Sequence, residues 1–143
     1  MIDQVTVLLP NEPNTLGPVA RALGEANVQM HALMIADTSE FGIVRIICDR
    51  PKAAVEAIQK AGYNATTTKV GAIDVPNVPG GLAGVLDVIG ASGINVEYAY
   101  CFGFEDRCVY VFKVNENEGL LDHLSESGYG TLQPQDLYAD DEL

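Results

Sequence analysis

The sequence predicts an α+β fold in which one βαββαβ unit occurs twice in tandem. Two observations indicate this fold: an internal repeat, and the same order of strand-like and helix-like apolar patterns in both halves of the 143 residues. In the repeat, Asn11–Leu16 aligns with Asn77–Leu82, and Ala61–Tyr63 aligns with Ser127–Tyr129. The offset is 66 residues at both places, without a gap, which indicates a duplication.

Each copy is expected to hold four strands and two helices. The strands are runs of β-branched and apolar residues, whereas the helices carry apolar residues at i, i+3, i+4 and i+7 from Leu16 and from Leu82. The first copy has predicted strands at 5–9, 28–36, 43–48 and 66–70, and helices at 16–23 and 51–61. The second has strands at 72–75, 94–102, 109–114 and 131–137, and helices at 82–89 and 118–127. This order is the ferredoxin-like arrangement, an antiparallel sheet with both helices on one face.

The transition between the copies is expected near residues 69–72, which gives domains at 1–70 and 71–143. Because no linker is evident there, we expect the two antiparallel sheets to lie side by side, with the helices on one face. Acidic residues collect at the C-terminus of the chain. We expect its carboxylates to belong to a solvated tail, formed by Asp136, Asp140, Asp141 and Glu142.

The composition narrows the classes of partner. A formal net charge of −12, from 8 Lys and Arg against 20 Asp and Glu, argues against nucleic acid and against anionic membranes. No apolar run approaches the ~18 residues that span a bilayer, and the N-terminus lacks the features of a signal peptide. The three cysteines, an odd number, fit reduced thiols, although Cys101 and Cys108 flank a turn where a disulfide is conceivable. We therefore expect a cytoplasmic protein.

Residues that could perform catalysis are few. The two histidines, His31 and His123, fall on a predicted strand and a predicted helix, and no Cys-x-x-Cys or Gly-Lys-Ser/Thr motif is present. We expect no catalytic residue, no metal site and no cofactor. Tyr98 and Tyr100 alternate along a predicted strand and therefore share one sheet face. That face is either an aromatic-lined site or a dimerisation surface.

A short motif lies between the first strand and the first helix of each copy. The second copy has the complete pattern Asn-x-Pro-Gly-x-Leu, at Asn77, Pro79, Gly80 and Leu82. With this motif, the element order and the repeat, the chain resembles a tandem pair of ACT domains, the small regulatory modules of enzymes of amino-acid metabolism. The resemblance covers nearly the whole chain and implies a stand-alone regulatory protein without a catalytic domain.

The first copy departs from the motif at one position. It has Asn11, Pro13 and Leu16, but Asn14 stands where the glycine belongs. Asparagine adopts left-handed conformations more readily than most residues, so the departure is mild. The pairs Asn14-Thr15 and Gly80-Gly81 also lie where each helix must begin, which suits N-cap chemistry.

The residues around the motif suit an amino-acid ligand. A helix N-terminus presents N–H groups and partial positive charge to a carboxylate, and Gly80 and Gly81 let a ligand approach the backbone. The resemblance implies a second polar residue at the start of the second strand, which is Gln29 in the first copy and Asn95 in the second. It also implies that the ligand lies where two such domains meet, so that each copy completes the pocket of the other. We also expect Asn77 and Asn95 to act on one ligand. The candidate ligand-binding residues are Asn11, Asn14, Thr15, Leu16, Gln29, Asn77, Pro79, Gly80, Gly81, Leu82 and Asn95.

The expected function is non-catalytic binding or sensing of a free amino acid, or a similar small carboxylate, as an allosteric effector. The resemblance implies that binding regulates amino-acid metabolism through an unlinked enzyme or transporter, with a homodimer as a further form of assembly. Two alternatives stay open. One is a protein–protein interaction module whose Asn-x-Pro-Gly loops are only turns. The other is a small ferredoxin-like enzyme that uses its carboxylates.

Overall fold

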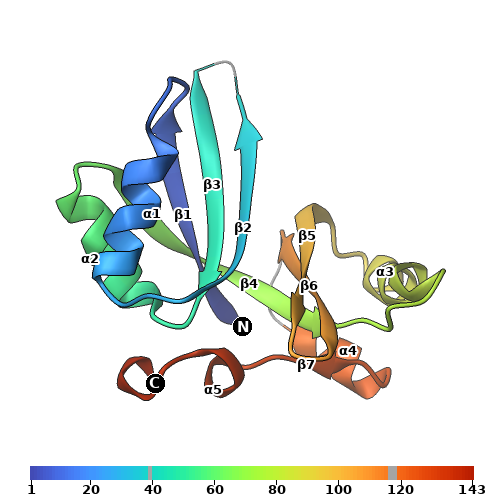
Figure 1. The fold of residues 1–143 in the computed structure, drawn as a ribbon. Coiled ribbons are helices and arrows are strands. Elements are labelled where there is room, and N and C mark those ends of the chain that lie inside the picture. Colours follow the sequence, from blue (N-terminus) through green and yellow to red (C-terminus); the bar gives the residue numbers. More distant parts are fainter. Residues whose placement is uncertain (39, 116–118) are drawn as a thin grey trace. The chain divides into compact units, whose positions relative to one another are not determined.

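The computed structural model describes residues 1–38, 40–115 and 119–143 (Figure 1). Contacts between Cα atoms divide the chain into two compact units. We call Asp3–Thr68 with Leu137–Leu143 the N-terminal unit, and Lys69–Asp136 with Met1–Ile2 the C-terminal unit. The last seven residues, which the sequence assigns to the second domain, therefore pack with the first.

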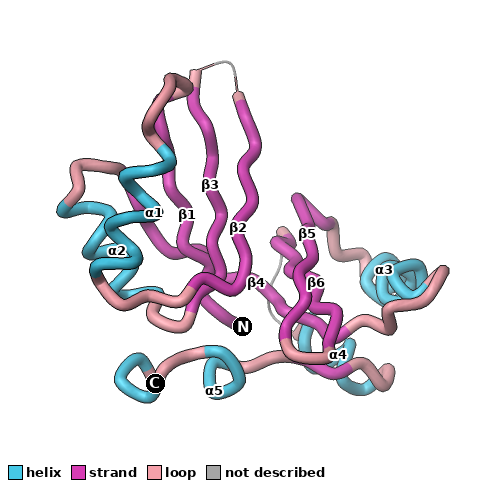
Figure 2. Tube along the Cα trace, in the orientation of Figure 1, coloured by secondary structure: helices cyan, strands magenta, loops and turns pink. Residues whose placement is uncertain are grey.

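The N-terminal unit has the predicted order of elements. They are β1 (Ile2–Pro10), α1 (Leu16–Glu25), β2 (Met30–Asp37), β3 (Phe41–Cys48), α2 (Pro51–Lys60) and the first part of β4 (Asn64–Asp74). The strands are ordered β2-β3-β1-β4, with β3 antiparallel to both of its neighbours. Both helices cover one face of the sheet (Figures 1 and 2). Ser39, within the predicted turn between β2 and β3, lies outside the described residues.

The core of this unit forms where the alternating strand residues meet the helices. On the helix-covered face, Val5 and Val7 of β1 pair with Ile46 and Val44 of β3. These four residues are fully buried. The helices contribute further buried residues at helical spacing, namely Val19, Leu23, Ala54 and Ile58. Each large apolar side chain buried in this way contributes about 1.5–3 kcal/mol to the free energy of unfolding.

The C-terminal unit repeats this plan. After the second part of β4 come α3 (Gly81–Ala91), β5 (Val96–Phe104), β6 (Arg107–Val114), α4 (Leu120–Glu126) and β7 (Gly130–Thr131). Strand β6 pairs antiparallel with both β4 and β5, and β7 pairs with β4. The core again joins one sheet face to two helices, through Ile73, Val75, Val85, Ile89, Phe112, Val114, Leu120 and Leu124. The βαββαβ fold class is therefore confirmed for both units.

Several boundaries differ from the predicted ones. The two strands expected at 66–70 and 72–75 are one strand, β4, because Val70, Gly71 and Ala72 between them are buried and extended. The last predicted strand, 131–137, is wrong: β7 ends at Thr131 and a short helix, α5 (Pro134–Leu137), follows. Proline suits the first turn of a helix and lacks the N–H that a strand needs. The predicted helix start at Glu118 lies outside the described residues.

The backbone preserves the duplication in detail. Left-handed residues, with positive φ, occur at equivalent positions 66 residues apart: Asn14 (φ 65°) and Gly80 (81°), Asn27 (57°) and Gly93 (73°), Gly62 and Gly128 (both 92°). The last two pairs follow the ends of the helices, where a left-handed residue closes the final turn. The first pair lies in the loops that contain the Asn-x-Pro motif.

Candidate functional site

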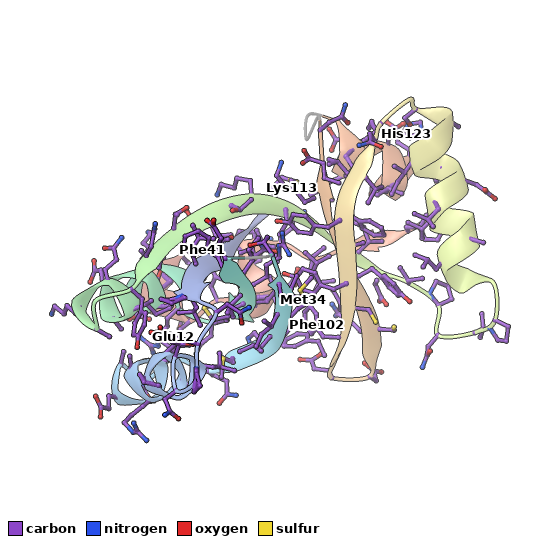
Figure 3. The ribbon with its side chains drawn as sticks, turned by 90° about the horizontal axis from the view of Figure 1, so that it is seen from above. Glu12, Met34, Phe41, Phe102, Lys113 and His123 are labelled. Atoms are coloured by element: carbon purple, nitrogen blue, oxygen red, sulfur yellow. The ribbon has the colours of Figure 1, made fainter. Side chains whose placement is uncertain are left out.

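The loop between β1 and α1 contains the first candidate site. Asn14 has φ 65°, so it adopts the left-handed conformation for which the sequence indicates a tolerance. Thr15 occupies the N-cap position, but its side chain makes no capping hydrogen bond. Its hydroxyl instead donates to the carbonyl oxygens of Glu12 (3.3 Å) and Pro10 (3.5 Å), on the loop side of the helix. Figure 3 shows Glu12 in this loop. The predicted side-chain cap is therefore absent at Thr15.

The loop between β4 and α3 is built by its two glycines, which have different roles. Gly80 is left-handed at φ 81°, and a Cβ added to it would meet nothing within 4 Å. A Cβ added to Gly81 would lie 2.1 Å from the carbonyl oxygen of Pro76. The N–H of Gly81 donates to the carbonyl oxygen of Val78 (3.0 Å). The loop's own folding thus requires Gly81, whereas Gly80 faces open space.

The first turns of α1 and α3 offer matched backbone donors. In the described part of the chain, the N–H groups of Leu82 and Ala83 form no hydrogen bond, nor do those of Leu16 and Gly17. The N-cap Gly80 has no side chain with which to satisfy them. Such N–H groups, with the partial positive charge of the helix, form an anion-binding arrangement.

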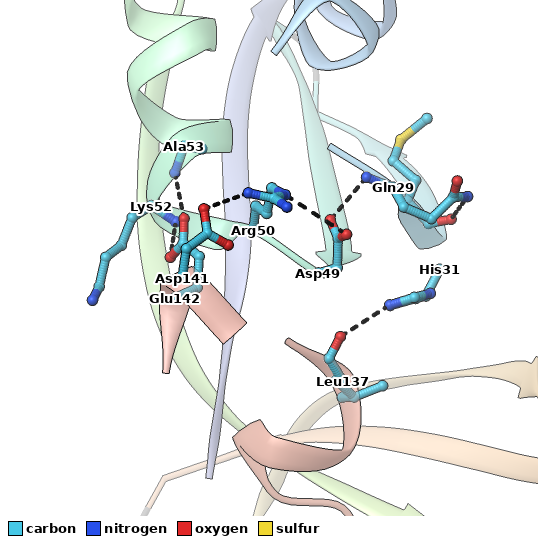
Figure 4. Close-up of polar contacts among 10 residues, drawn as sticks. Gln29, His31, Asp49, Arg50, Lys52, Ala53, Leu137, Asp141 and Glu142 are labelled. Carbon is cyan, nitrogen blue, oxygen red and sulfur yellow. Dashed lines mark hydrogen bonds and ion pairs between the residues drawn. The ribbon is translucent and has the colours of Figure 1, made fainter. Parts of the chain in front are cut away.

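The second polar positions, Gln29 and Asn95, are held by a bridge that occurs in both copies. The N–H of Gln29 donates to Oδ1 of Asp49 (2.8 Å), and the N–H of Asp49 donates to the carbonyl oxygen of Gln29 (3.1 Å; Figure 4). Asn95 and Asn115 form the same pair of bonds, at 2.9 and 3.1 Å. Both side chains at the strand starts are exposed. Asp49 and Asn115 were missed as candidates, although their 66-residue separation could have identified them.

Within each unit, the loop and the second polar position lie at opposite ends of the sheet. The N–H of Val75, just before the β4–α3 loop, donates to the carbonyl oxygen of Cys108 at the start of β6. The Asn95–Asn115 bridge follows Val114, six residues further along β6, which corresponds to about 20 Å. The expectation that Asn77 and Asn95 act on one ligand is therefore wrong for a single C-terminal unit. In the N-terminal unit, Pro10 pairs with Phe41 and Met30 with Cys48, with the same consequence for Asn11 and Gln29.

The remaining titratable and aromatic groups occupy separate places. His123 is exposed on α4 (Figure 3), and Nε2 of His31 lies 3.3 Å from the carbonyl oxygen of Leu137. Among the described residues, no group of three or more His, Cys, Asp and Glu could hold a metal ion. Nor does any described helix have the length and apolarity to cross a membrane. Tyr98 and Tyr100 share the sheet face opposite the helices of their unit, as their register on β6 shows.

The cysteines are all free. Cys48 is buried, and burial raises the pKa of its thiol to about 12. Cys101 is exposed on β5 opposite Tyr110, whereas Cys108 on β6 lies opposite Gly103. The two cysteines of this hairpin are therefore not a directly opposed pair.

A groove of about 470 Å³ lies in the N-terminal unit between α1 and α2, away from the candidate loops. It is lined by small residues at helical spacing, chiefly Ala22, Ala26, Ala53 and Ala57. Charged residues complete it, namely Glu25, Glu56 and Lys60. The sequence signal for this groove is the pairing of alanines at i and i+4 along both helices, Ala22 with Ala26 and Ala53 with Ala57.

Comparisons with known proteins agree with this fold. The sequence matches the family model of the ACT domain pair over residues 1–128. The crystal structure of a protein from Bacteroides thetaiotaomicron is 31% identical and has a TM-score of 0.87, covering 94% of this chain and 93% of that chain. The ligand-free regulatory subunit of aspartate kinase from Thermus thermophilus is 16% identical, with a TM-score of 0.63 over 87% of this chain and 91% of that chain.

The regulatory subunit of aspartate kinase from Thermus flavus is similar, at 17% identity and a TM-score of 0.57 over 88% of this chain and 92% of that chain. At these identities the likeness to the two kinase subunits is one of fold. Among curated proteins, none matches the sequence. The family match includes both candidate loops and both βαββ segments, and it confirms the resemblance identified from the motif. The chain belongs to the ACT domain pair family.

Proposed function

We propose that this protein is a non-catalytic regulator that binds a free amino acid, or a similar small carboxylate, at the β4–α3 loop. One observation carries the proposal: α3 begins without a side-chain cap, beside a glycine that leaves its first turn open. Helices usually begin with a capping Ser, Thr, Asp or Asn, whose loss costs about 1 kcal/mol. A ligand carboxylate would take the place of that cap.

The groups around this helix start suit the two ends of an amino acid. The N–H groups of Leu82 and Ala83 would donate to the carboxylate, which the positive end of the helix dipole also favours. The exposed side chain of Asn77 offers both a donor and an acceptor amide group, which suits the α-amino group or a polar side chain. Gly80 leaves the approach unobstructed.

The two copies differ in how open this approach is. In the β1–α1 loop the N–H groups of Leu16 and Gly17 are placed equivalently, but Asn14 carries a side chain where Gly80 has none. That side chain could supply a ligand contact or cover the helix start. The β4–α3 loop is therefore proposed as the stronger site, and Asn11 with Asn14, Thr15 and Leu16 as a second, weaker one.

The proposed output is regulation of an unlinked enzyme of amino-acid metabolism, with a homodimer as the assembled form. Membership of the ACT domain pair family supports a regulatory role, and the likeness to aspartate kinase regulatory subunits supports the fold of such a protein. Gln29 and Asn95, exposed at the strand starts, are proposed as secondary contacts that do not share a ligand with the loop of their own unit.

A thermal-shift screen against the twenty amino acids tests the proposal. A ligand at 100 times its dissociation constant adds about 2.7 kcal/mol to the free energy of unfolding, which raises Tm by about 5–10 °C for a chain of this size. Asn77→Ala should remove most of the shift, whereas Asn64→Ala, an exposed asparagine at the start of β4, should keep it. No shift with any amino acid at millimolar concentration would refute amino-acid binding and favour the interaction-module alternative.

A further inference from the structure

The C-terminal segment, Leu137–Leu143, is bound to the N-terminal unit by its last carboxylates (Figure 4). Glu142 is only 8% exposed, and its carboxylate oxygens accept hydrogen bonds from the backbone N–H groups of Lys52 (3.1 Å) and Ala53 (2.9 Å). The neighbouring Asp141 forms an ion pair with the guanidinium group of Arg50. The prediction of a solvated tail is therefore wrong for Glu142.

The rest of the segment is attached through polar contacts of its backbone and of the Tyr138 hydroxyl. The N–H of Ala139 donates to the carbonyl oxygen of Asp49 (2.8 Å), and the N–H of Asp3 donates to the hydroxyl oxygen of Tyr138 (2.6 Å). The carbonyl oxygen of Leu137 lies 3.3 Å from Nε2 of His31. The segment thus contacts the starts of β1 and β2 and the junction between β3 and α2.

The surface that receives these carboxylates has the features of a built anion site. Helix α2 begins with Pro51 at its first position, and its N-cap residue Arg50 makes no capping hydrogen bond. A carboxylate from 90 residues away therefore supplies the cap, at the end of the helix where negative charge is favoured. Arg50 receives the adjacent carboxylate, and arginine–carboxylate bonds are among the stronger ones in proteins.

We propose that this surface is a recognition site for acidic peptides with two adjacent carboxylates, and that the C-terminal segment is its internal, displaceable occupant. The acidic-peptide site consists of Arg50 with the N–H groups of Lys52 and Ala53. It goes beyond the proposed amino-acid function, and its residues are all in the N-terminal unit. A partner that presents an Asp-Glu pair in an extended segment would compete with the C-terminal segment, which acts as an autoinhibitory strap.

The charge of the protein explains why the occupant is part of the same chain. With a net charge of −12, the protein repels a free acidic peptide, so a partner in solution binds weakly while the strap is in place. A tethered segment has an effective concentration of the order of millimolar, which compensates for this repulsion. A partner therefore gains access when the strap is weakened or when its own local concentration is high.

A peptide-binding experiment tests the proposal. The probe is the labelled heptapeptide Leu-Tyr-Ala-Asp-Asp-Glu-Leu, added to the full chain and followed by fluorescence anisotropy. The variant that combines Asp141→Asn with Glu142→Gln has a weakened strap and should bind the peptide at least tenfold more tightly than the unmodified protein. Adding Arg50→Gln to that variant should reduce the affinity tenfold or more. A peptide with Gln in place of its Glu should bind equally poorly to all forms.

Hydrogen exchange supplies a second measurement that does not depend on the double variant. Glu142→Gln alone should speed exchange at the amides of Lys52 and Ala53, and saturating heptapeptide should slow it again. Asp140→Asn is the matched control, because Asp140 is exposed and its side chain makes no hydrogen bond or ion pair with the described residues. Equal peptide affinity for the unmodified chain and the double variant, or unchanged exchange in Glu142→Gln, would overturn the proposal. Neither result would alter the part of the amino-acid thermal shift that Asn77→Ala removes, because Asn77 lies in the other unit.

Discussion

Substitutions at Gly80 separate the conformation of the β4–α3 loop from its proposed binding role. At φ 81° and ψ −4°, Gly80 is in the left-handed region, where a residue with a Cβ is disfavoured by about 1–2 kcal/mol. Because nothing lies within 4 Å of an added Cβ, the cost of adding that atom is backbone strain. The equivalent position in the first copy is Asn14, at φ 65°, which shows that asparagine fits this backbone.

These facts give an order of stability for three variants. Gly80→Asn should lower the free energy of unfolding by about 0.5 kcal/mol, Gly80→Ala by about 1, and Gly80→Val by about 2, since a branched side chain resists this conformation further. Urea unfolding followed by circular dichroism measures the differences. With a slope of about 2 kcal/mol per molar, Gly80→Val should lower the midpoint by about 1 M.

The neighbouring glycine provides the matched control. Gly81→Ala would place its Cβ 2.1 Å from the carbonyl oxygen of Pro76, so the loop must move, at a cost of about 3 kcal/mol. If Gly80→Val is as stable as Gly80→Asn, the strain argument is refuted. If Gly81→Ala is milder than Gly80→Ala, the close approach of the Pro76 carbonyl does not restrict position 81. If Gly80→Asn folds but no longer binds an amino acid, the ligand needs the space that Gly80 leaves open at the start of α3.

Three further predictions concern other parts of the chain. At pH 8, iodoacetamide should alkylate Cys101 in the native protein and spare Cys48, whose thiol is buried with a pKa of about 12; native labelling of Cys48, detected by mass spectrometry, would contradict this. Burial likewise raises the pKa of Tyr138 to about 12, above its unfolded value of about 10, so the folded state retains the proton and stability should fall as pH rises from 10 to 12. Tyr138→Phe should show a smaller decline in urea midpoint over that range, and an equal decline would exclude Tyr138 as a contributor. Finally, Asn77→Ala and Asn95→Ala should change amino-acid affinity additively, to within about 0.5 kcal/mol in a double-mutant cycle, and a larger coupling would mean that one ligand contacts both.

Local sequence patterns predicted those elements of the fold that depend on local interactions. The apolar spacing from Leu16 and from Leu82 identified α1 and α3, and the predicted helix ends at 61 and 127 lie within one residue of the ends of α2 and α4. The sequence divided strand β4 in two because the boundary between the copies was placed at residues 69–72. In the folded chain Gly71, within that boundary, is buried, and a Cβ added to it would contact Leu120 and Leu121 of α4.

The binding loops were predicted in position but only partly in mechanism. Asn14 was correctly expected to tolerate a left-handed conformation. The structural requirement for Gly81 depends on where the loop places the carbonyl oxygen of Pro76, which cannot be deduced from residue spacing. The separation of Asn77 from Asn95 could have been deduced. In a βαββ segment the helix returns the chain to the opposite end of the sheet, so the end of the first strand and the start of the second cannot meet.

The cap on α2 could not have been predicted from local patterns. Composition alone made Glu142 part of an acidic tail, and an acidic run is normally solvated. Its burial depends on an interaction with Lys52 and Ala53 across 90 residues of chain, and on the absence of a capping side chain at Arg50. The sequence of α2 nevertheless contained an indication. Arg50-Pro51 begins the helix and no acidic residue lies in its first turn, so a cap has to come from elsewhere in the chain.

The duplication has therefore produced two units with one backbone and different chemistry. At equivalent positions, Asn14 replaces Gly80 beside the helix start, and Asp49 replaces Asn115 in the bridge that holds the second strand. The C-terminal segment packs with the unit that contains Asp49. The N–H of Ala139 in this segment donates to the carbonyl oxygen of Asp49, whose side chain accepts a hydrogen bond from the N–H of Gln29. Release of the strap would thus loosen the start of β2 as well as the cap of α2. The open start of α3 lies in one unit, and the start of α2, which Glu142 occupies, lies in the other. The stronger site for a small carboxylate and the site for an acidic peptide would therefore belong to different copies of the same fold.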